Sequence, residues 1–259
     1  TFARLTSRLS VSKSGGSGTV TSNVGGIDCG STCSATLDQG STVTLTATPD
    51  AGYAFKEWTG ACSGSGSCSV TMTASTSVTA VFKPRLTVTG TDGHGTLTSD
   101  VGGIDCGSSC SAFIDKDTQV TLTATAADGY RFLSWSGCDS SNGTQCTVSV
   151  GAPRTVSASF VQRFSLTAAS PEHGSITSVP SGISCPDAAC TASFGTDEDV
   201  TLTARPDSGY RFSAWGDACK GTVTEACTVS LTSAQSVSAT FARLTSRLSV
   251  SKSGGSGTV

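Results

Sequence analysis

A threefold internal repeat constrains the fold of this chain more than any other feature. The segment GIDCGSTC, which begins at Gly26, recurs as GIDCGSSC from Gly103 and more loosely as GISCPDAAC from Gly182. Each copy continues with a Val-Thr-Leu-Thr-Ala run, a Gly-Tyr turn, one Trp and a second pair of cysteines, so the 12 Cys and 3 Trp divide equally. Such a period predicts consecutive small structural units rather than one large core.

The repeat divides the chain into three modules and the start of a fourth, over residues 1–83 (with strand entry near Arg8), 84–161, 162–242 and 243–259. Residues 240–259 repeat residues 1–20 letter for letter, so 243–259 is identical to 4–20. The three modules differ at many positions, whereas this match differs at none. We therefore interpret 239 residues as a higher-order period of a longer tandem array; an engineered duplication is the alternative.

Within a module the apolar residues alternate with threonine. Val43 and Leu45 are separated in this way, as are Val78 and Ala80, which is the period of a half-buried strand. Ser, Thr, Gly and Val dominate the chain and are weak helix formers. The expected fold class is all-β: a rod-like tandem array of three small β-sandwich or β-grasp-like modules without helices.

Two local features refine this expectation. Phe55 and Trp58 are three residues apart, which breaks the alternation and predicts a β-bulge or a strand end. Only two residues separate Phe82 from Arg85-Leu86, and two separate Phe160 from Arg163-Phe164, while the third junction is longer. Junctions this short predict neighbouring modules held at a nearly fixed angle.

The order of motifs resembles a known family. A G-T-V-T-S hairpin, G-I-D-C, V-T-L-T-A, P-D-x-G-Y-x-F, W-x-G-x-C and a closing S-V-x-A-x-F follow one another in this chain. This order resembles the divergent internalin-B-type B-repeats, which occur in tandem on secreted and surface proteins of bacteria. The resemblance implies an extracellular location and a compact module related to the β-grasp group. The chain departs from the listerial repeat by lacking a helical segment and by adding cysteines.

The cysteines form two close pairs in each module: Cys29/Cys33, Cys62/Cys68, Cys106/Cys110, Cys138/Cys146, Cys185/Cys190 and Cys219/Cys227. The spacing within a pair varies little between modules, which favours local disulfides, although four cysteines allow three connectivities. Zinc knuckles are the alternative interpretation. Paired cysteines at this density indicate an oxidising compartment.

Trp58, Trp135 and Trp215 are candidate ligand-binding residues, because exposed aromatic rings can stack on sugars. The competing interpretation places each Trp in a small core beside Tyr53, Tyr130 or Tyr210. Replacement of Trp58 by Ala would separate loss of binding from loss of stability.

Other polar residues suggest no catalytic centre. His94 and His173 fall in the first hairpin loop of their modules, where the first module has Gly-Ser. The acidic pairs Asp115/Asp117 and Asp197/Asp199 could bind calcium, but the first module has only Asp38 there, and solvated turns are the simpler interpretation. We expect no catalytic residue, no metal site and no cofactor.

Charge and hydropathy argue against nucleic acid as a partner and against a membrane-spanning segment. The formal net charge is −3, and no basic stretch is interleaved with aromatic residues, so nucleic acid is not expected as a partner. No apolar run approaches the roughly 18 residues of a membrane span. We expect a non-enzymatic extracellular structural protein that forms a stiff stalk, fibre or sheath on a bacterial surface, through self-association or continuation of the array. The alternative is an adhesive array that binds surface glycan, or another surface partner, through Trp or through edge strands.

Overall fold

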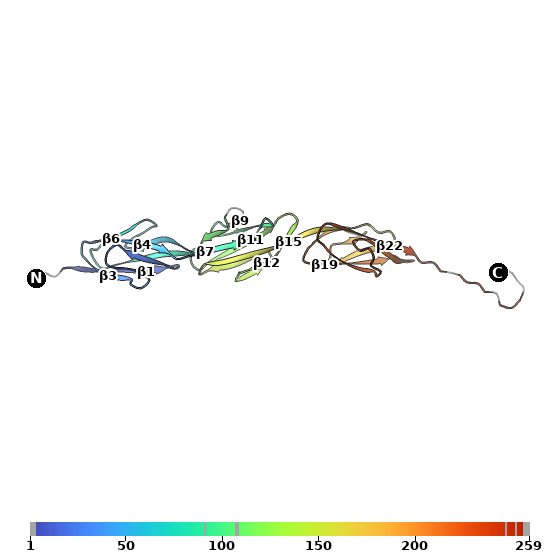
Figure 1. Ribbon diagram of the computed structural model, residues 1–259, viewed down its shortest axis with the longest axis horizontal. Coiled ribbons are helices and arrows are strands. Elements are labelled where there is room, and N and C mark those ends of the chain that lie inside the picture. Colours follow the sequence, from blue (N-terminus) through green and yellow to red (C-terminus); the bar gives the residue numbers. More distant parts are fainter. Residues whose placement is uncertain (1–3, 91, 107–108, 247, 252, 256–259) are drawn as a thin grey trace. The chain divides into compact units, whose positions relative to one another are not determined.

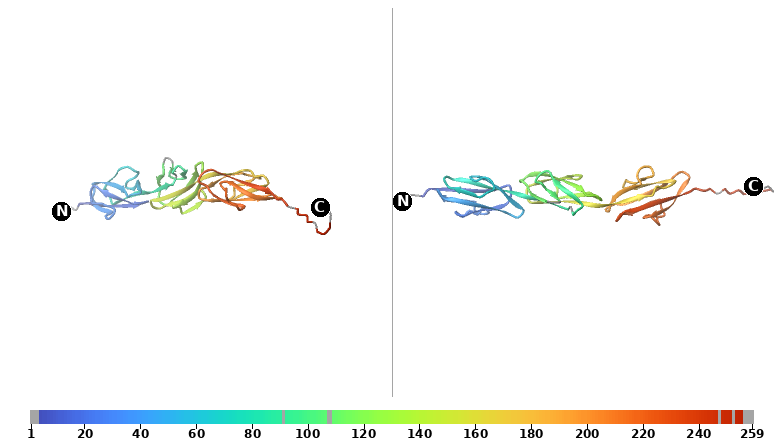
Figure 2. Two further views of the ribbon diagram at one scale, coloured as in Figure 1. Left: turned by 45° about the vertical axis from the view of Figure 1, so that its right-hand side comes forward. Right: turned by 90° about the horizontal axis from the view of Figure 1, so that it is seen from above.

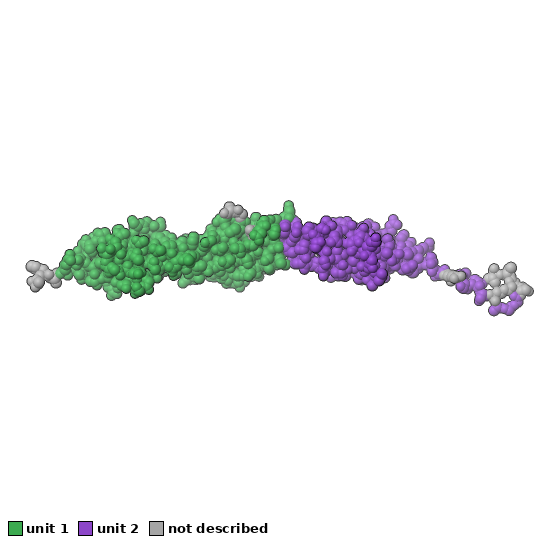
Figure 3. Space-filling view, viewed as in Figure 1, with its two compact units in different colours: residues 1–128, 132–160 green, residues 129–131, 161–259 purple. Residues whose placement is uncertain are grey.

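The computed structural model describes residues 4–90, 92–106, 109–246, 248–251 and 253–255. Every named element among them is a strand, which confirms the all-β class, and none of these residues forms a helix that could span a membrane (Figure 1). The chain divides into two compact units, residues 1–128 with 132–160 and residues 129–131 with 161–259 (Figure 3). The first unit holds module 1 and most of module 2, and the second holds module 3 together with residues 129–131 of module 2.

Module 1 is a sandwich of two sheets. Its strands are β1 (Thr6–Ser14), β2 (Gly18–Ser22), β3 (Ser34–Asp38), β4 (Thr42–Pro49), β5 (Tyr53–Gly60), β6 (Cys68–Thr71) and the first half of β7 (Thr76–Thr89). One sheet has the order β5-β7-β1-β3, in which β1 and β7 are parallel and the other pairs are antiparallel. The other sheet is antiparallel, with the order β2-β4-β6.

Module 2 repeats this arrangement. Its strands are the second half of β7, β8 (Gly95–Ser99), β9 (Asp105–Cys106), β10 (Ser111–Phe113), β11 (Thr118–Ala126), β12 (Tyr130–Ser136), β13 (Ser140–Asn142), β14 (Gln145–Val150) and the first part of β15 (Arg154–Ala168). The order β12-β15-β7-β10 matches the first sheet of module 1, again with a central parallel pair. The second sheet gains the short edge strands β9 and β13.

Module 3 has the same plan. Its strands are the last part of β15, β16 (Gly174–Val179), β17 (Ser184–Cys185), β18 (Thr191–Gly195), β19 (Asp199–Pro206), β20 (Tyr210–Asp217), β21 (Ala226–Ser230) and β22 (Gln235–Arg243). One sheet has the order β20-β22-β15-β18, and the other has the order β17-β16-β19-β21. Modules without a helix, each with two facing sheets, correspond to the sandwich rather than to a grasp around a helix.

The core of each module lies between its sheets. In module 1, Leu9 of β1, Val43 of β4 and Val78 of β7 belong to one buried cluster. The predicted alternation is seen directly in β6, where Cys68 and Val70 are buried and Ser69 is exposed. The bulge predicted near Phe55 is also confirmed, because the β5–β7 register shifts between Phe55 and Glu57.

Strand β7 belongs to two modules. Its residues Thr76–Val81 form the last strand of module 1, and Arg85–Thr87 belong to the first strand of module 2. One unbroken strand therefore replaces a linker (Figures 1 and 2). Lys83 and Pro84 lie within this strand. The two residues between Phe82 and Arg85 therefore belong to a continuous strand and do not form a flexible linker.

Strand pairing sets the register at the start of module 3. Leu166 holds the position of Leu9 and Leu86: all three are fully buried, and their antiparallel partners are Ala192, Ala35 and Ala112 respectively. The pairing with β18 fixes this register.

A glycine begins the second strand of each module because a phenylalanine packs on its backbone. A Cβ at Gly18 would lie 2.6 Å from ring atoms of Phe82. The corresponding distances are 2.7 Å for Gly95 and Phe160, and 2.5 Å for Gly174 and Phe241. The aromatic ring thereby ties the last strand of the module to its first hairpin.

Candidate functional site

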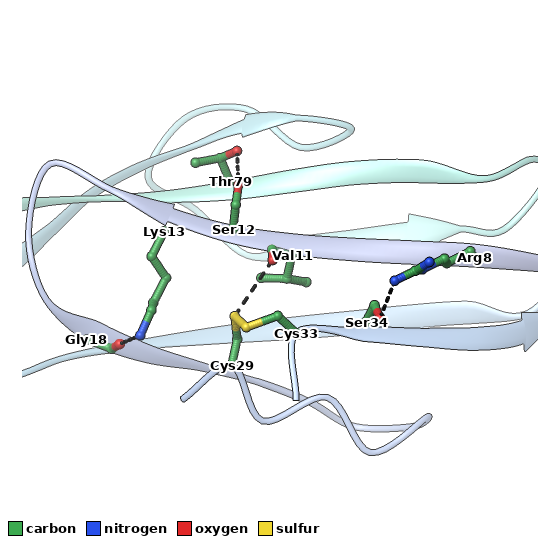
Figure 4. Close-up of a disulfide and its surroundings, with 9 residues drawn as sticks. All are labelled: Arg8, Val11, Ser12, Lys13, Gly18, Cys29, Cys33, Ser34 and Thr79. Atoms are coloured by element: carbon green, nitrogen blue, oxygen red, sulfur yellow. Dashed lines mark hydrogen bonds between the residues drawn. A yellow bond between two sulfur atoms is a disulfide. The ribbon is translucent and has the colours of Figure 1, made fainter. Parts of the chain in front are cut away.

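The first disulfide of module 1 joins Cys29 to Cys33 where the two sheets meet (Figure 4). The Cys33 carbonyl accepts a hydrogen bond from the Val11 amide of β1, at 2.8 Å, and the Cys29 amide donates to the Val20 carbonyl of β2, also at 2.8 Å. The Cys29 Sγ lies 3.7 Å from the Val11 carbonyl oxygen, a contact rather than a hydrogen bond because a disulfide sulfur carries no proton. The loop therefore bridges both layers of the sandwich.

The same local link occurs in the other modules, as Cys106–Cys110 and Cys185–Cys190. In each case the second cysteine accepts a backbone hydrogen bond from the first strand, from Val88 at 2.8 Å and from Ala168 at 2.7 Å. All twelve cysteines lie in local pairs, and none is free among the described residues.

The second disulfide closes a loop over the tryptophan. Cys62 is joined to Cys68, and the enclosed loop supplies the Gly66 carbonyl, which accepts a hydrogen bond from the Trp58 indole Nε1 at 3.1 Å. Module 3 does the same with Cys219–Cys227: the Trp215 Nε1 donates to the Thr224 carbonyl at 2.9 Å. Here the disulfide fixes the loop that satisfies the buried indole.

Trp135 of module 2 lacks this partner. The loop between Cys138 and Cys146 is folded into the β13–β14 hairpin, and the Trp135 Nε1 is buried with no hydrogen-bond partner among the described residues. Trp58 and Trp215 are only 3% and 4% exposed, whereas Trp135 is partly exposed. The three candidate residues therefore share a position but not a hydrogen-bonding state.

Each tryptophan packs in a row of aromatic rings. The centroid of Phe55 lies 5.0 Å from that of Trp58 and 5.9 Å from that of Phe82. Phe132 and Phe212 make the same pairs of contacts in their modules. These rings provide much of the apolar bulk in a Thr-rich module. A pocket of about 270 Å³ lies beside Trp58, with Thr44, Thr46 and Ser65 on its wall.

The two histidines are turn residues. The backbone oxygen of His94 accepts from the residue after β11 at 2.9 Å, and that of His173 accepts from the residue after β19 at 3.0 Å. Ser17 makes the matching contact in module 1 at 3.2 Å. The His173 ring also stacks on Tyr210, with centroids 4.1 Å apart.

The acidic pairs make ion pairs and hydrogen bonds. Asp197 pairs with Arg131 at 2.8 Å, and both residues belong to the second unit. Asp199 accepts a hydrogen bond from Ser230. No group of three or more His, Cys, Asp or Glu within the described ranges is arranged to hold a metal ion.

Asp115 forms the ionic part of the junction between modules 1 and 2. Its Oδ1 lies 3.1 Å from the Lys56 Nζ and 3.4 Å from the Lys83 Nζ. The hydrogen bond from Lys56 lowers the pKa of Asp115, with Lys83 acting in the same direction and burial opposing both. The same hydrogen bond raises the pKa of Lys56. Sequence analysis noted Asp115 but missed this cluster, because the lysines lie far away along the chain.

Backbone contacts support the same junction. The Arg85 amide donates to the Gly52 carbonyl at 2.9 Å, and the Ile114 amide donates to the Pro84 carbonyl at 2.9 Å. A Cβ at Gly52 would lie 2.9 Å from Pro153, so the Gly-Tyr turn of module 1 packs closely on module 2. Gly52 also has a φ of 83°, which favours glycine. The repeated Gly-Tyr motif thus serves the junction as well as its own hairpin.

Comparison with known proteins identifies the repeat. Residues 9–86, 85–163 and 164–245 each match the model of the divergent InlB B-repeat domain. No curated protein matches the chain. Among solved structures, the open conformation of the pilus adhesin SpaC from Lactobacillus rhamnosus GG aligns with 10% identity and a TM-score of 0.31. That alignment covers 95% of this chain and 44% of the adhesin, so the chain spans less than half of its length.

Proposed function

The chain belongs to the divergent InlB B-repeat family, and from this premise we propose that it is an extracellular structural protein of a bacterial surface. In this role successive modules form a stiff stalk, fibre or sheath component, and intramodule disulfides stabilise each module. The observation that carries the proposal is β7, which is at once the closing strand of module 1 and the opening strand of module 2.

Three further contacts support stiffness at this junction. The Gly52 turn packs on Pro153 of module 2, and Asp115 of module 2 pairs with Lys56 and Lys83. A continuous strand, a close van der Waals contact and an ionic cluster each oppose bending between the two modules. A linker of two flexible residues would supply none of them.

The junction can be tested by measuring distances between modules 1 and 2. Spin labels at two exposed positions, Ser65 in a loop of module 1 and Ser141 on the short strand β13 of module 2, should give a narrow distance distribution. Insertion of Gly-Ser-Gly-Ser after Lys83 should broaden it while leaving the melting of the modules nearly unchanged. A distribution that is equally broad without the insertion contradicts a stiff stalk. Negative-stain images should then show ordered filaments or rods with a repeat commensurate with three modules.

An adhesive array remains the second candidate, and Trp135 favours it in module 2. Its indole N–H is buried without a partner, so a polar ligand group that reached it would satisfy a donor. The test is binding to a panel of bacterial and host glycans by the full chain and by Trp135→Phe. Loss of binding in Trp135→Phe with unchanged melting supports adhesion at this residue. If the unaltered chain binds no glycan on the panel, the adhesion proposal is contradicted.

A further inference from the structure

The alanine that ends the Val-Thr-Leu-Thr-Ala run is covered in two modules and uncovered in the first. Ala124 and Ala204 are 3% and 0% exposed, whereas Ala47 is only partly buried. The three hold the same place in the smaller sheet, in the antiparallel pairs Val20–Ala47, Leu97–Ala124 and Ile176–Ala204. The difference in burial therefore comes from what lies beyond the alanine and not from its position in the sheet.

In modules 2 and 3 the second disulfide loop covers the alanine. The Thr144 carbonyl accepts a hydrogen bond from the Ala124 amide at 2.9 Å, and the Glu225 carbonyl accepts from the Ala204 amide at 2.8 Å. Each accepting residue stands two positions before the cysteine that ends the loop, and both loops join cysteines eight residues apart. A main-chain carbonyl thus occupies the same place in both modules.

Module 1 lacks this contact because its loop is shorter. The two cysteines are six residues apart, and the carbonyl of the matching residue, Gly66, accepts from the Trp58 indole instead. β6 accordingly begins only at Cys68, opposite Leu45, and does not reach Ala47. The edge of β4 is left without a neighbour at this point.

The Ala47 amide points toward the open place. The Thr44 carbonyl accepts from the Asn23 amide at 3.1 Å, so the backbone groups of Thr44 face β2. Backbone groups of alternate strand residues face opposite edges, so those of Ala47, three residues on, face the side of β6. Among the described residues, no loop carbonyl accepts a hydrogen bond from this amide.

The space past the end of β6 is the pocket of about 270 Å³ beside Trp58, and Ala47 lies on its wall. Leu45 and Phe55 line the same pocket. Residues opposite each other in an antiparallel pair place their side chains on one face. A strand residue opposite Ala47 would therefore direct its side chain to the face of Leu45, where Phe55 and Trp58 belong to the same apolar cluster.

We propose that module 1 binds an extended peptide segment of a partner protein here, in line with β6 and antiparallel to β4. The Ala47 amide donates to a main-chain carbonyl of the peptide, and an apolar side chain of the same peptide residue lies beside Phe55 and Trp58. Modules 2 and 3 favour a peptide as the occupant, because a main-chain carbonyl fills the place in both. The site is separate from the stalk junction and from Trp135, so it adds a binding function to the structural role.

Hydrogen exchange of the three alanine amides, measured by NMR, tests whether the place is open. All three alanines follow a threonine, so their unprotected amides exchange at similar rates. We expect the Ala47 amide to exchange at least about tenfold faster than those of Ala124 and Ala204, the factor that corresponds to one backbone hydrogen bond.

Titration with a synthetic peptide, acetyl-Thr-Val-Thr-amide, tests the occupant. We expect a saturable shift of the Ala47 amide resonance, with the resonances of Ala124 and Ala204 unmoved. The matched peptide acetyl-Thr-Asp-Thr-amide should shift Ala47 less, because a carboxylate loses its hydration against the aromatic rings. A trimer of N-acetylglucosamine supplies amide carbonyls on a sugar and tests a glycan as the occupant.

A loop graft closes the site without touching β4. Replacing Ser63–Ser67 by the sequence of Lys220–Ala226 gives module 1 the cysteine spacing of module 3. We expect the Ala47 amide to become as protected as that of Ala204 and the peptide-induced shift to be lost. Trp135→Phe is the control, because it alters module 2 only and should leave the shift of Ala47 unchanged.

Three results would overturn the proposal. The first is an Ala47 amide that exchanges as slowly as that of Ala124. The second is an Ala47 resonance that the peptide does not shift, or that only the sugar trimer shifts. The third is a folded graft that binds the peptide as well as the unaltered chain does. The first two need no variant, so a graft that fails to fold leaves the proposal falsifiable, and none of the three bears on the Ser65–Ser141 distance.

Discussion

The Lys56 ammonium of module 1 lies 3.1 Å from the Asp115 carboxylate of module 2, and the Asp115 side chain is 53% exposed. Lys83, which lies on the shared strand itself, approaches the same carboxylate. One acidic residue is thus held by a lysine from the body of module 1 and by a lysine from the strand that leaves it. Because solvent screens this cluster, its contribution is expected to depend on salt and pH.

Loss of the Asp115 charge should lower stability in a defined pH range. The folded pKa of Asp115 is depressed, so its stabilisation is present above the unfolded value of about 3.9 and is lost as pH falls through the folded value. We expect Asp115→Asn to lower Tm by about 1–3 °C near neutral pH. Calorimetry of both proteins from pH 7 to pH 2 should show this difference begin to shrink below about pH 4 and vanish once the pH falls below the folded pKa of Asp115.

Asp117→Asn is the matched control, since it makes the same charge change two residues away. High salt should also shrink the effect of Asp115→Asn but not that of the control. A difference that persists at pH 2 would show that the ionic pairing is not its cause.

Reduction of the disulfides should lower the melting temperature sharply. Each link closes a loop of five to nine residues, counting both cysteines, and should contribute on the order of 2 kcal/mol in the chain-entropy model, or about 4 kcal/mol per module. Modules of this size have limited cores, so this is a large share of their stability. Calorimetry in excess reductant measures the effect, and an unchanged melt contradicts it.

Removal of the indole N–H should affect modules 1 and 2 differently. Trp58→Phe leaves the Gly66 carbonyl without its donor, whereas Trp135→Phe removes a donor that has no partner. We expect Trp58→Phe to be more destabilising than Trp135→Phe by about 1 kcal/mol. Urea unfolding followed by circular dichroism compares them. Trp58 is more buried than Trp135, so its lost ring volume adds to the difference in the same direction. Equal destabilisation would argue against the assigned hydrogen bond.

A methyl group at Gly18 should disturb the aromatic contact of module 1. Gly18→Ala would place its Cβ 2.6 Å from the Phe82 ring, and overpacking of this kind costs about 1–3 kcal/mol. Gly66→Ala is the control, because a Cβ there meets nothing within 4 Å. Thermal unfolding should show a lower Tm for the first variant and little change for the second.

The alternation of apolar residues was sufficient to predict the strands that carry Val43 and Leu45 in β4 and Val78 and Ala80 in β7, because burial on one sheet face follows period two. The bulge at Phe55 followed from a break in that period. The ion cluster could not be inferred, since Lys56 of β5 and Asp115 of the β10–β11 turn come together only where modules 1 and 2 pack on each other. The register of module 3 could not be inferred from the sequence, because the pairing of Leu166 with Ala192 of β18 decides it.

The tryptophans show a similar limit. Their matching positions in the three repeats predicted one shared role, and the aromatic row around them is indeed shared. What differs is the loop between the second pair of cysteines, which caps Trp58 and Trp215 but forms a hairpin beside Trp135. Loop conformation depends on turn residues that repeat less regularly than the core.

The parallel pairing of β1 with β7 also determines how the protein responds to mechanical force. The chain enters module 1 through β1 and leaves it through β7, and the two strands are direct neighbours from Leu9–Thr76 to Ser14–Val81. A pull along the chain therefore loads this ladder in shear, so that its hydrogen bonds must break together and not one after another. β7 and β15 repeat the geometry in module 2, so tension passes from one sheared ladder directly into the next.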